Sequence, residues 1–244
     1  MDNNAHFAIC IPMANEERDF DSFITPLKKA LSDFPNVTVY LVVDNASKDR
    51  TPELCEALGR EDARFRYVWA PENRNVVDAY LRGFKEAVAA EPDYIVEMDG
   101  GGSHDPAAIP AFLRALREGN ECAFGSRYIN GGSLHDSPFK RRFLSKFGSF
   151  LGRRLLGCGV KDATSGYEAF TLAVMKDILA YPLRSRAHFY QTELRYLLNK
   201  RNWVEVPIHY VSPSPRVSPN ALKNSLGCLF HYTLRRFTGR RDNI

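Results

Sequence analysis

Residues 93–106 read DYIVEMDGGGSHDP, and this stretch decides the fold that we expect for the chain. Its apolar run stops abruptly at Asp99, which is followed by three consecutive glycines and a second polar group. A short apolar run bounded by turn residues is typical of a buried strand in a parallel sheet. Parallel sheets bind their ligands beyond the carboxyl ends of the strands. We therefore expect Asp99 at a strand tip, facing a crevice, on backbone that glycine makes adaptable.

Strand and helix patterns alternate on both sides of this stretch. Short β-branched or apolar runs predict strands at 7–12, 37–43, 65–69, 94–98 and 121–125. Helical periodicity predicts helices between them at about 15–32, from 47 or 49 onward, at 76–90 and at 107–118. This alternation predicts an α/β fold in which a central, mostly parallel sheet carries helices on both faces.

The pattern changes after residue 128. Helices are then predicted at about 140–156, 189–200 and 220–237, and a strand at 203–211, with loops between them. The last few residues, from 239 to 244, are expected to fray. We expect one domain over 1–244, with a nucleotide-binding half at about 6–128, an acceptor-binding half at about 129–237 and a tail at 238–244.

The bulk composition is that of an ordinary globular protein. The chain has 244 residues, of which 44% are hydrophobic and 25% charged, and its net charge is +4. This small positive excess suits an anionic small molecule or an anionic membrane surface. It is too weak to indicate a nucleic acid as partner, and the sequence contains no nucleic-acid recognition motif.

The cysteine spacing and the patterns for secretion and membrane insertion indicate the cellular compartment of the protein. The five cysteines are scattered and form no C-x-x-C pair, so neither a disulfide framework nor a zinc site is indicated. The sequence shows no signal-peptide pattern and no apolar run long enough for a membrane span. We expect a cytoplasmic protein, and the basic and apolar helix around 143–157 leaves open a peripheral contact with the cytoplasmic membrane face.

Acidic or amide side chains follow three of the predicted strands, as Asn15 and Glu16, Asp44, and Asp99. Each alone could be a turn or helix-cap residue. Together, at neighbouring strand ends, they suit the hydroxyl groups of a nucleotide and a cation on its diphosphate. The sequence lacks both G-x-G-x-x-G and a Walker lysine loop, which argues against a Rossmann dehydrogenase and a P-loop NTPase.

Six segments, in chain order, resemble motifs of the inverting GT-A nucleotide-sugar glycosyltransferases, and most closely of their dolichol- or polyprenol-phosphate mannosyltransferase branch. They read IPMANEE at 11–17, VVDNASKDRT at 42–51, MDGGGSHDP at 98–106, GSRY at 125–128, DATSGY at 162–167 and EVPI at 205–208. The resemblance covers about residues 6–237. It implies the GT-A fold, a nucleotide-sugar donor such as GDP-mannose, a polyprenyl or dolichyl phosphate acceptor and inversion at the anomeric carbon.

The resemblance also implies a role for individual residues. It places the donor nucleotide against Pro12, Asn15, Glu16, Asp44, Asp99 and Arg216. Asp99 would hold Mg²⁺ or Mn²⁺ and, with Arg127, stabilise the leaving diphosphate. Arg141 and Ser145, which stand four apart on one helical face, would bind the acceptor phosphate.

One departure from the family pattern lies at the metal motif itself. The family's Asp-x-Asp has become Asp99-Gly100-Gly101, and a single carboxylate is a poor divalent site. Two alternatives therefore stay open: a catalytically silent protein that binds nucleotide-sugars, and a transferase acting on a soluble small molecule. An alcohol acceptor would need a general base, for which Asp105 and Glu193 are the candidates.

Overall fold

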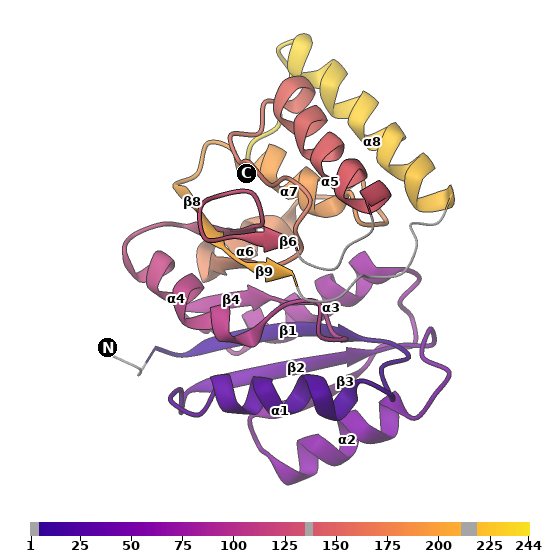
Figure 1. Cartoon of the computed structure of the whole chain (residues 1–244), viewed down its shortest axis with the longest axis vertical. Coiled ribbons are helices and arrows are strands. Elements are labelled where there is room, and N and C mark those ends of the chain that lie inside the picture. Colours follow the sequence, from indigo (N-terminus) through magenta and orange to yellow (C-terminus); the bar gives the residue numbers. More distant parts are fainter. Residues whose placement is uncertain (1–4, 135–138, 211–218) are drawn as a thin grey trace.

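Apolar and β-branched residues build a seven-stranded sheet with the order β3-β2-β1-β4-β7-β5-β8 (Figure 1). The strands are β1 (Phe7–Met13), β2 (Val37–Val43), β3 (Phe65–Trp69), β4 (Tyr94–Glu97), β5 (Cys122–Ser126), β7 (Glu168–Thr171) and β8 (Trp203–Pro207). Strand β7 runs antiparallel to β4 and β5, whereas the other neighbouring pairs are parallel. Two short strands, β6 (Ser133–Leu134) and β9 (His209–Tyr210), pair in a separate sheet. The predicted α/β fold with a mostly parallel sheet is confirmed.

Helices cover both faces of the sheet in this computed structural model, which describes residues 5–134, 139–210 and 219–244. One face carries α1 (Phe20–Ala30), α2 (Thr51–Glu61), the 3₁₀ turn η1 (Pro106–Ala108) and α4 (Ile109–Arg117). The other carries α3 (Val76–Ala89), α6 (Leu172–Ala180), α7 (Tyr190–Leu197), α8 (Pro219–Phe237) and the π-helical segment η2 (Gly152–Leu156), which continues α5 (Phe139–Leu151).

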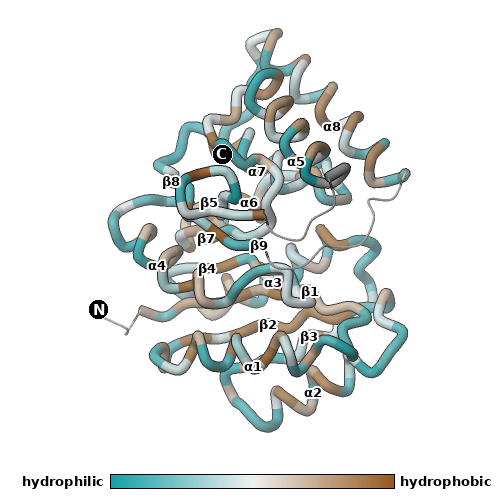
Figure 2. The backbone as a smooth tube through the Cα atoms, in the orientation of Figure 1, coloured by the Kyte–Doolittle hydropathy of each residue, from teal (hydrophilic) through white to brown (hydrophobic). Residues whose placement is uncertain are grey.

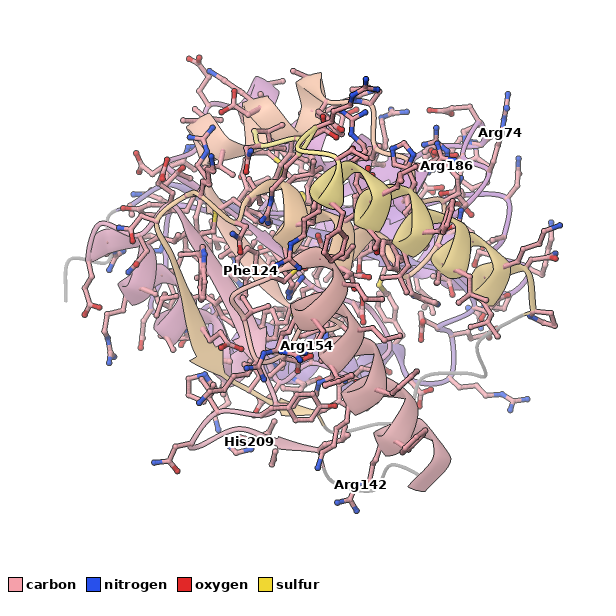
Figure 3. All side chains as sticks on the ribbon, turned by 90° about the horizontal axis from the view of Figure 1, so that it is seen from above. Arg74, Phe124, Arg142, Arg154, Arg186 and His209 are labelled. Carbon is pink, nitrogen blue, oxygen red and sulfur yellow. The ribbon has the colours of Figure 1, made fainter. Side chains whose placement is uncertain are left out.

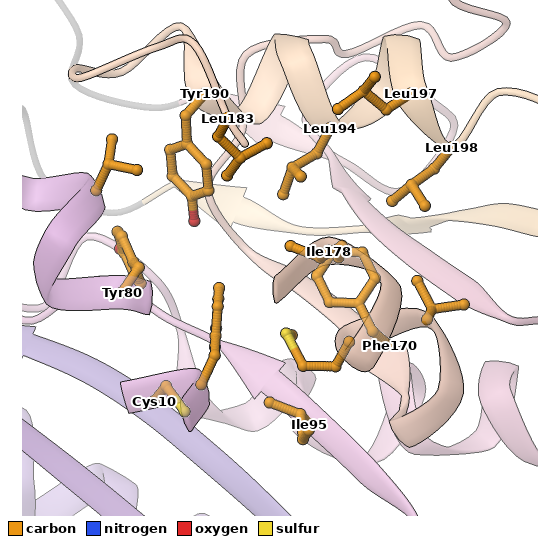
Figure 4. Packing of buried hydrophobic residues seen from close by; sticks show 14 of the residues in the cluster. Cys10, Tyr80, Ile95, Phe170, Ile178, Leu183, Tyr190, Leu194, Leu197 and Leu198 are labelled. Carbon is orange, nitrogen blue, oxygen red and sulfur yellow. The ribbon is translucent and has the colours of Figure 1, made fainter. Parts of the chain in front are cut away.

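The core divides into two layers because successive side chains of a strand point to opposite faces. In β1, Ala8 and Cys10 face the layer of α3, α6 and α7, whereas Phe7, Ile9 and Ile11 face α1 and α4. The strands are accordingly hydrophobic along most of their length (Figure 2). Figure 4 shows the first layer, in which side chains from α3, α6 and α7 pack over the sheet.

Helix α1 begins at Phe20, five residues later than the sequence predicts. The reason is the conformation of the preceding loop, where Asn15 has a φ of 60°. The backbone N–H of Glu16 donates to Thr51 Oγ1 at the start of α2, and that of Glu17 donates to Asp49 Oδ2 in the loop after β2, so neither opens a helix. Acidic residues that read as a helix start therefore belong to a loop between two strand ends.

Two other segments differ from expectation. The short apolar stretch after 167 forms both β7 and α6, which the sequence pattern did not separate. The chain end, expected to fray, is docked on the fold: Ile244 N–H donates to the Leu197 carbonyl (3.2 Å), Arg201 Nε donates to the Ile244 carbonyl (2.8 Å), and Arg235 pairs with Asp242 (2.5 Å).

Candidate active site

Asp99 follows β4 at the carboxyl edge of the sheet and is fixed on one side. Its N–H donates to His104 Nδ1 (3.1 Å), and its carboxylate accepts the hydroxyl of Tyr80. Burial lowers the pKa of His104, so the ring is neutral and carries its hydrogen on Nε2, 3.6 Å from Asp99 Oδ2. The Asp99 side chain is still 37% exposed. Contacts with the protein therefore orient the Asp99 side chain, and its exposed part remains accessible to a ligand.

Tyr80 is a contact that sequence reasoning missed. It lies on the inward face of α3 and packs against Tyr190, with the two ring centroids 5.4 Å apart (Figure 4). Burial raises the pKa of Tyr80, so its hydroxyl keeps the proton that it donates to Asp99. In the sequence, Tyr80 fits the apolar periodicity of a core helix, and nothing there marks its hydroxyl as part of a site.

Asn15 joins the loops that follow β1 and β2. Its backbone N–H donates to Ser47 Oγ (3.1 Å), its Nδ2 donates to the Ala46 carbonyl (3.0 Å), and its Oδ1 accepts the N–H of Lys48 (2.9 Å). Its left-handed backbone conformation is one that asparagine tolerates. Asn15 thus shapes the edge of the site through contacts within the protein.

Pro12, Glu16 and Asp44 lie at the same edge as Asp99, because β1 pairs with both β2 and β4. Asp44 is buried after β2 and accepts the N–H of Ala46 at Oδ1 (2.8 Å). A β-carbon at Gly100 would lie 2.9 Å from the Pro12 carbonyl oxygen, so the glycine loop after Asp99 packs directly over the end of β1. Most of the predicted donor residues are therefore neighbours in space, whereas Arg216 lies outside the described residues.

The Glu16 carboxylate lies over Gly101, the position of the missing second aspartate. A β-carbon at Gly101 would be 2.6 Å from Glu16 Oε2 and 3.0 Å from Oε1. In the described part of the chain, no group of three or more histidine, cysteine or acidic side chains could hold a metal ion. The residues present fit a divalent cation as a pair of carboxylates, Glu16 and Asp99, since such ions are often held by one or two carboxylates and substrate phosphates.

Arg127, expected to face the leaving diphosphate, is buried after β5 in an ion pair with Asp162. Its Nε and Nη2 donate to the two oxygens of that carboxylate, at 2.7 and 2.8 Å. Nη2 also donates to Ser145 Oγ (3.0 Å) and Thr164 Oγ1 (2.8 Å). Burial acts to raise the pKa of Asp162, but the Arg127 guanidinium outweighs it and the pKa is lowered. The pair is therefore ionised at neutral pH.

Ser145, a predicted acceptor residue, lies in the cluster around Arg127. Its Oγ also accepts the hydroxyl of Tyr128 (2.9 Å). The Tyr210 ring connects this cluster to the Asp99 loop: its centroid is 5.6 Å from the Arg127 guanidinium carbon and 6.2 Å from the His104 ring. The predicted acceptor and donor regions thus adjoin. Arg141 lies one turn before Ser145 in α5, and its side chain is outside the described residues.

A second buried arginine, Arg195 of α7, lies in the interior and stabilises the carboxyl edge of the sheet through its polar contacts. It pairs with Glu168 (2.5 Å) and donates to the carbonyls of Asp162 (3.0 Å) and Ser165 (2.9 Å). Glu97 lies directly across from Glu168 in the sheet, and burial, followed by the charge of Glu168, raises its pKa well above the usual range. In the sequence, Arg195 reads as an exposed helix residue, so its role was missed.

Gln191 is the helix α7 side chain that reaches toward Asp99. A β-carbon at Gly166 would lie 3.1 Å from Gln191 Nε2 and 3.4 Å from Asp99 Oδ1, so these two groups converge on the same glycine. Glu193, the expected candidate for a base, points elsewhere. Its carboxylate accepts backbone N–H groups that precede α7 and the hydroxyl of Tyr232, which makes it a structural residue.

Replacing Gly166 by alanine is expected to destabilise the fold by about 1–3 kcal/mol, because the new methyl group meets Gln191 and Asp99 in a packed site. The matched control is Gly227→Ala in α8, where a β-carbon meets nothing within 4 Å. That change is expected to stabilise by about 0.5–1 kcal/mol. Urea denaturation measures both, and equal effects would show that Gly166 is not sterically constrained.

Exposed apolar side chains form stripes on α5 and α8, which lie next to each other in both Figures 1 and 3. We call this surface the α5–α8 face; its large apolar residues are Phe143, Phe147, Phe150, Leu222, Leu226, Phe230, Leu234 and Phe237. Basic side chains flank it, and Figure 3 shows Arg142 projecting outward from α5. None of the described helices combines the length and hydrophobicity that a membrane crossing requires.

A mostly parallel sheet with acidic side chains in the loops at its carboxyl edge is an architecture that binds ligands at that edge. The model of the family Glycosyl transferase family 2 matches residues 8–179, and the chain belongs to this family. It is therefore a glycosyltransferase.

Relatives with known names are similar over most of their length. The chain is 32% identical to polyprenol monophosphomannose synthase of Mycolicibacterium smegmatis over 237 residues, which is 96% of this chain and 88% of that protein. It is 32% identical to undecaprenyl-phosphate mannosyltransferase of Micrococcus luteus over 204 residues, 82% of each chain.

Solved structures of glucosyl-3-phosphoglycerate synthase from Mycobacterium tuberculosis share the fold. The complex with UDP has a TM-score of 0.68 at 16% identity, covering 94% of this chain and 80% of that one. A complex with Mn²⁺, UDP and glucosyl-3-phosphoglycerate has a TM-score of 0.64 at 18% identity, covering 97% and 80%. At this identity the likeness establishes the GT-A fold.

Proposed function

We propose that the protein transfers mannose from GDP-mannose to a polyprenyl phosphate, with inversion at the anomeric carbon. The observation that carries this proposal is the junction of two regions at one sheet edge. Asp99 marks the donor side, and the Arg127–Ser145 cluster beneath the basic helix α5 marks the acceptor side. The names of the mannosyltransferases to which the chain is 32% identical support the choice of sugar and acceptor.

The chemistry follows from these positions. An oxygen of the acceptor phosphate attacks the anomeric carbon and forms the new C–O bond. The bond to the nucleoside diphosphate breaks on the opposite side, and its electron pair leaves with the diphosphate. An acceptor phosphate is already anionic at neutral pH and needs no general base, which agrees with the structural engagement of Glu193 and with Asp105 capping η1.

The protein contributes mainly positioning and charge stabilisation to such a reaction. We assign the donor nucleotide to the edge formed by Pro12, Glu16 and Asp44, and its diphosphate to Asp99. We assign the acceptor phosphate to Arg127 and Ser145 and, from the family resemblance alone, to Arg141. Asp99 would hold a divalent cation, which would supply positive charge to offset the charge developing on the leaving diphosphate.

A direct transfer assay tests this function. Purified protein is incubated with radiolabelled GDP-mannose, MgCl₂ or MnCl₂, and undecaprenyl phosphate in detergent, and the lipid fraction is analysed for mannosyl phosphate. Parallel reactions contain other nucleotide-sugars and, as a soluble acceptor, phosphoglyceric acid. Labelled lipid formed only with GDP-mannose supports the proposal. A labelled soluble product contradicts it. A lack of turnover with every nucleotide-sugar tested also contradicts it.

The α5–α8 face supports a lipid acceptor, because an amphipathic surface with basic flanks binds at the boundary of an anionic bilayer. Phe143 and Phe230 are 60% and 74% exposed on it. Burying one such phenylalanine in the bilayer contributes about 1.5–3 kcal/mol. This surface would hold the enzyme where the phosphate of a polyprenyl lipid meets water.

Changing either phenylalanine to serine is therefore expected to weaken binding to vesicles of phosphatidylglycerol and phosphatidylcholine by about tenfold or more. Co-sedimentation of protein with the vesicles measures this. The control is Trp69→Ser, which removes a 43% exposed aromatic residue from β3, outside the α5–α8 face. Equally strong vesicle binding by Phe143→Ser, Phe230→Ser and Trp69→Ser would contradict a membrane-binding role for this face.

A further inference from the structure

Position 101 shows how this chain departs from a two-aspartate metal motif. Gly101 has a φ of +72°, and a β-carbon there would lie 2.6 Å from Glu16 Oε2. A side chain at 101 and the Glu16 carboxylate in its present place are therefore mutually exclusive. The oxygens that an aspartate would bring to this point are replaced in space by those of Glu16.

Asp99 is prepared for a ligand at the same place. The Tyr80 hydroxyl donates to its carboxylate on the protein side, and His104 Nδ1 accepts its backbone N–H. Gln191 is buried, its Nε2 and Asp99 Oδ1 both lie within 3.4 Å of a β-carbon position at Gly166, and its Oε1 has no hydrogen-bond partner in the described part of the chain. Gln191 thus adjoins Asp99 at the carboxylate oxygen that also accepts the Tyr80 hydroxyl.

The charges of this region are arranged for a cation. The Glu16 carboxylate lies against Gly101, in the loop that directly follows Asp99. A divalent ion held by two carboxylates offsets the repulsion between their charges. Glu17, the next residue, is oriented differently: its carboxylate accepts the N–H of Arg50 at 3.2 Å and lies 3.8 Å from that guanidinium.

We propose that Glu16 is the second carboxylate ligand of the divalent cation, in place of an aspartate at position 101, and that it shares the ion with Asp99. The remaining ligands are then phosphate oxygens of the donor, as is common for Mg²⁺ sites that have one or two protein carboxylates. This inference rests on the proposed function, because it takes a nucleoside diphosphate as the partner of the ion.

Metal binding without sugar transfer tests it. Mn²⁺ is titrated into protein with GDP, and free Mn²⁺ is followed by electron paramagnetic resonance, with GDP alone as the blank. Glu16→Gln is expected to raise the Kd for Mn²⁺ by at least about tenfold, whereas the matched control Glu17→Gln stays within about twofold of the wild type. Melting temperatures establish that both variants are folded. If Glu16→Gln is not folded, Glu16→Asp is tested in its place.

A double variant tests whether the two positions are equivalent. Glu16→Ala combined with Gly101→Asp moves the second carboxylate to position 101, as in the family's Asp-x-Asp, and aspartate tolerates the positive φ better than most residues. We expect it to bind Mn²⁺ within about fivefold of the wild type, since the number of carboxylates is unchanged. The inference is overturned if Glu16→Gln binds like Glu17→Gln, or if the double variant binds no better than Glu16→Gln.

The outcome is separate from that of the transfer assay. Loss of Mn²⁺ in Glu16→Gln, without sugar transfer by the wild type, refutes the proposed function and supports the metal site. Transfer of mannose to the lipid, with Mn²⁺ affinity unchanged in Glu16→Gln, supports the proposed function and refutes the metal site.

Discussion

Asp99→Asn is expected to lower kcat/KM for sugar transfer by roughly 10³-fold, which corresponds to about 4 kcal/mol of transition-state stabilisation. The change removes the negative charge that we assign to the cation on the donor diphosphate. It keeps the shape of the side chain and an oxygen that can accept the Tyr80 hydroxyl. The loss is therefore expected in turnover and in metal binding, with the melting temperature close to that of the wild type.

The control is Asp105→Asn, in the same loop. Asp105 caps η1 by accepting the N–H of Ala107 at 2.9 Å, and asparagine caps equally well. Its kcat/KM is expected to stay within about threefold of the wild type, because the change leaves the cap in place. If Asp99→Asn retains more than a tenth of wild-type turnover, the site is not organised around Asp99.

The strand ends of the site were predictable because their signals are local. An apolar run that ends in an acid or a glycine identifies both the strand and its tip, and parallel pairing then brings the tips together. This reasoning predicted the shared edge of Glu16, Asp44 and Asp99, and the structure places these residues there. It did not predict that Asn15 would be used to join two loops, since that depends on a left-handed residue and on partners from β2.

The buried polar framework was not predictable, because its partners are far apart in the sequence. Asp162 follows Arg127 by 35 residues, and Arg195 contacts Glu168 across 27 residues. Propensity and periodicity mark the helix that carries Arg195 but not which of its polar side chains is buried. The antiparallel strand β7 was missed for a similar reason: a four-residue segment with only two apolar side chains, directly before a helix, gives no sign of its direction.

Asp162→Ala is expected to lower the free energy of unfolding by about 3–5 kcal/mol, because it leaves the Arg127 guanidinium buried without its charged partner. Both side chains are almost entirely buried, at 5% and 0% exposed. The folded-state pKa of Asp162 is lowered, so this stabilisation is present above the unfolded pKa of the carboxyl and is lost only as pH falls through the lower folded value. Urea denaturation should give the same difference between variant and wild type from pH 8 to pH 5.

Two comparisons separate a buried ion pair from lost packing. Glu56→Ala breaks an exposed pair with Arg60, whose side chains are 50% and 74% exposed, and is expected to change stability by less than about 1 kcal/mol. Adding Arg127→Met to Asp162→Ala removes the uncompensated charge, so the double variant should be more stable than Asp162→Ala alone. If it is less stable, Arg127 stabilises the fold through Ser145 and Thr164 rather than through its charge partner. In that case the link from α5 to β5, and not the ion pair, fixes the acceptor side of the site.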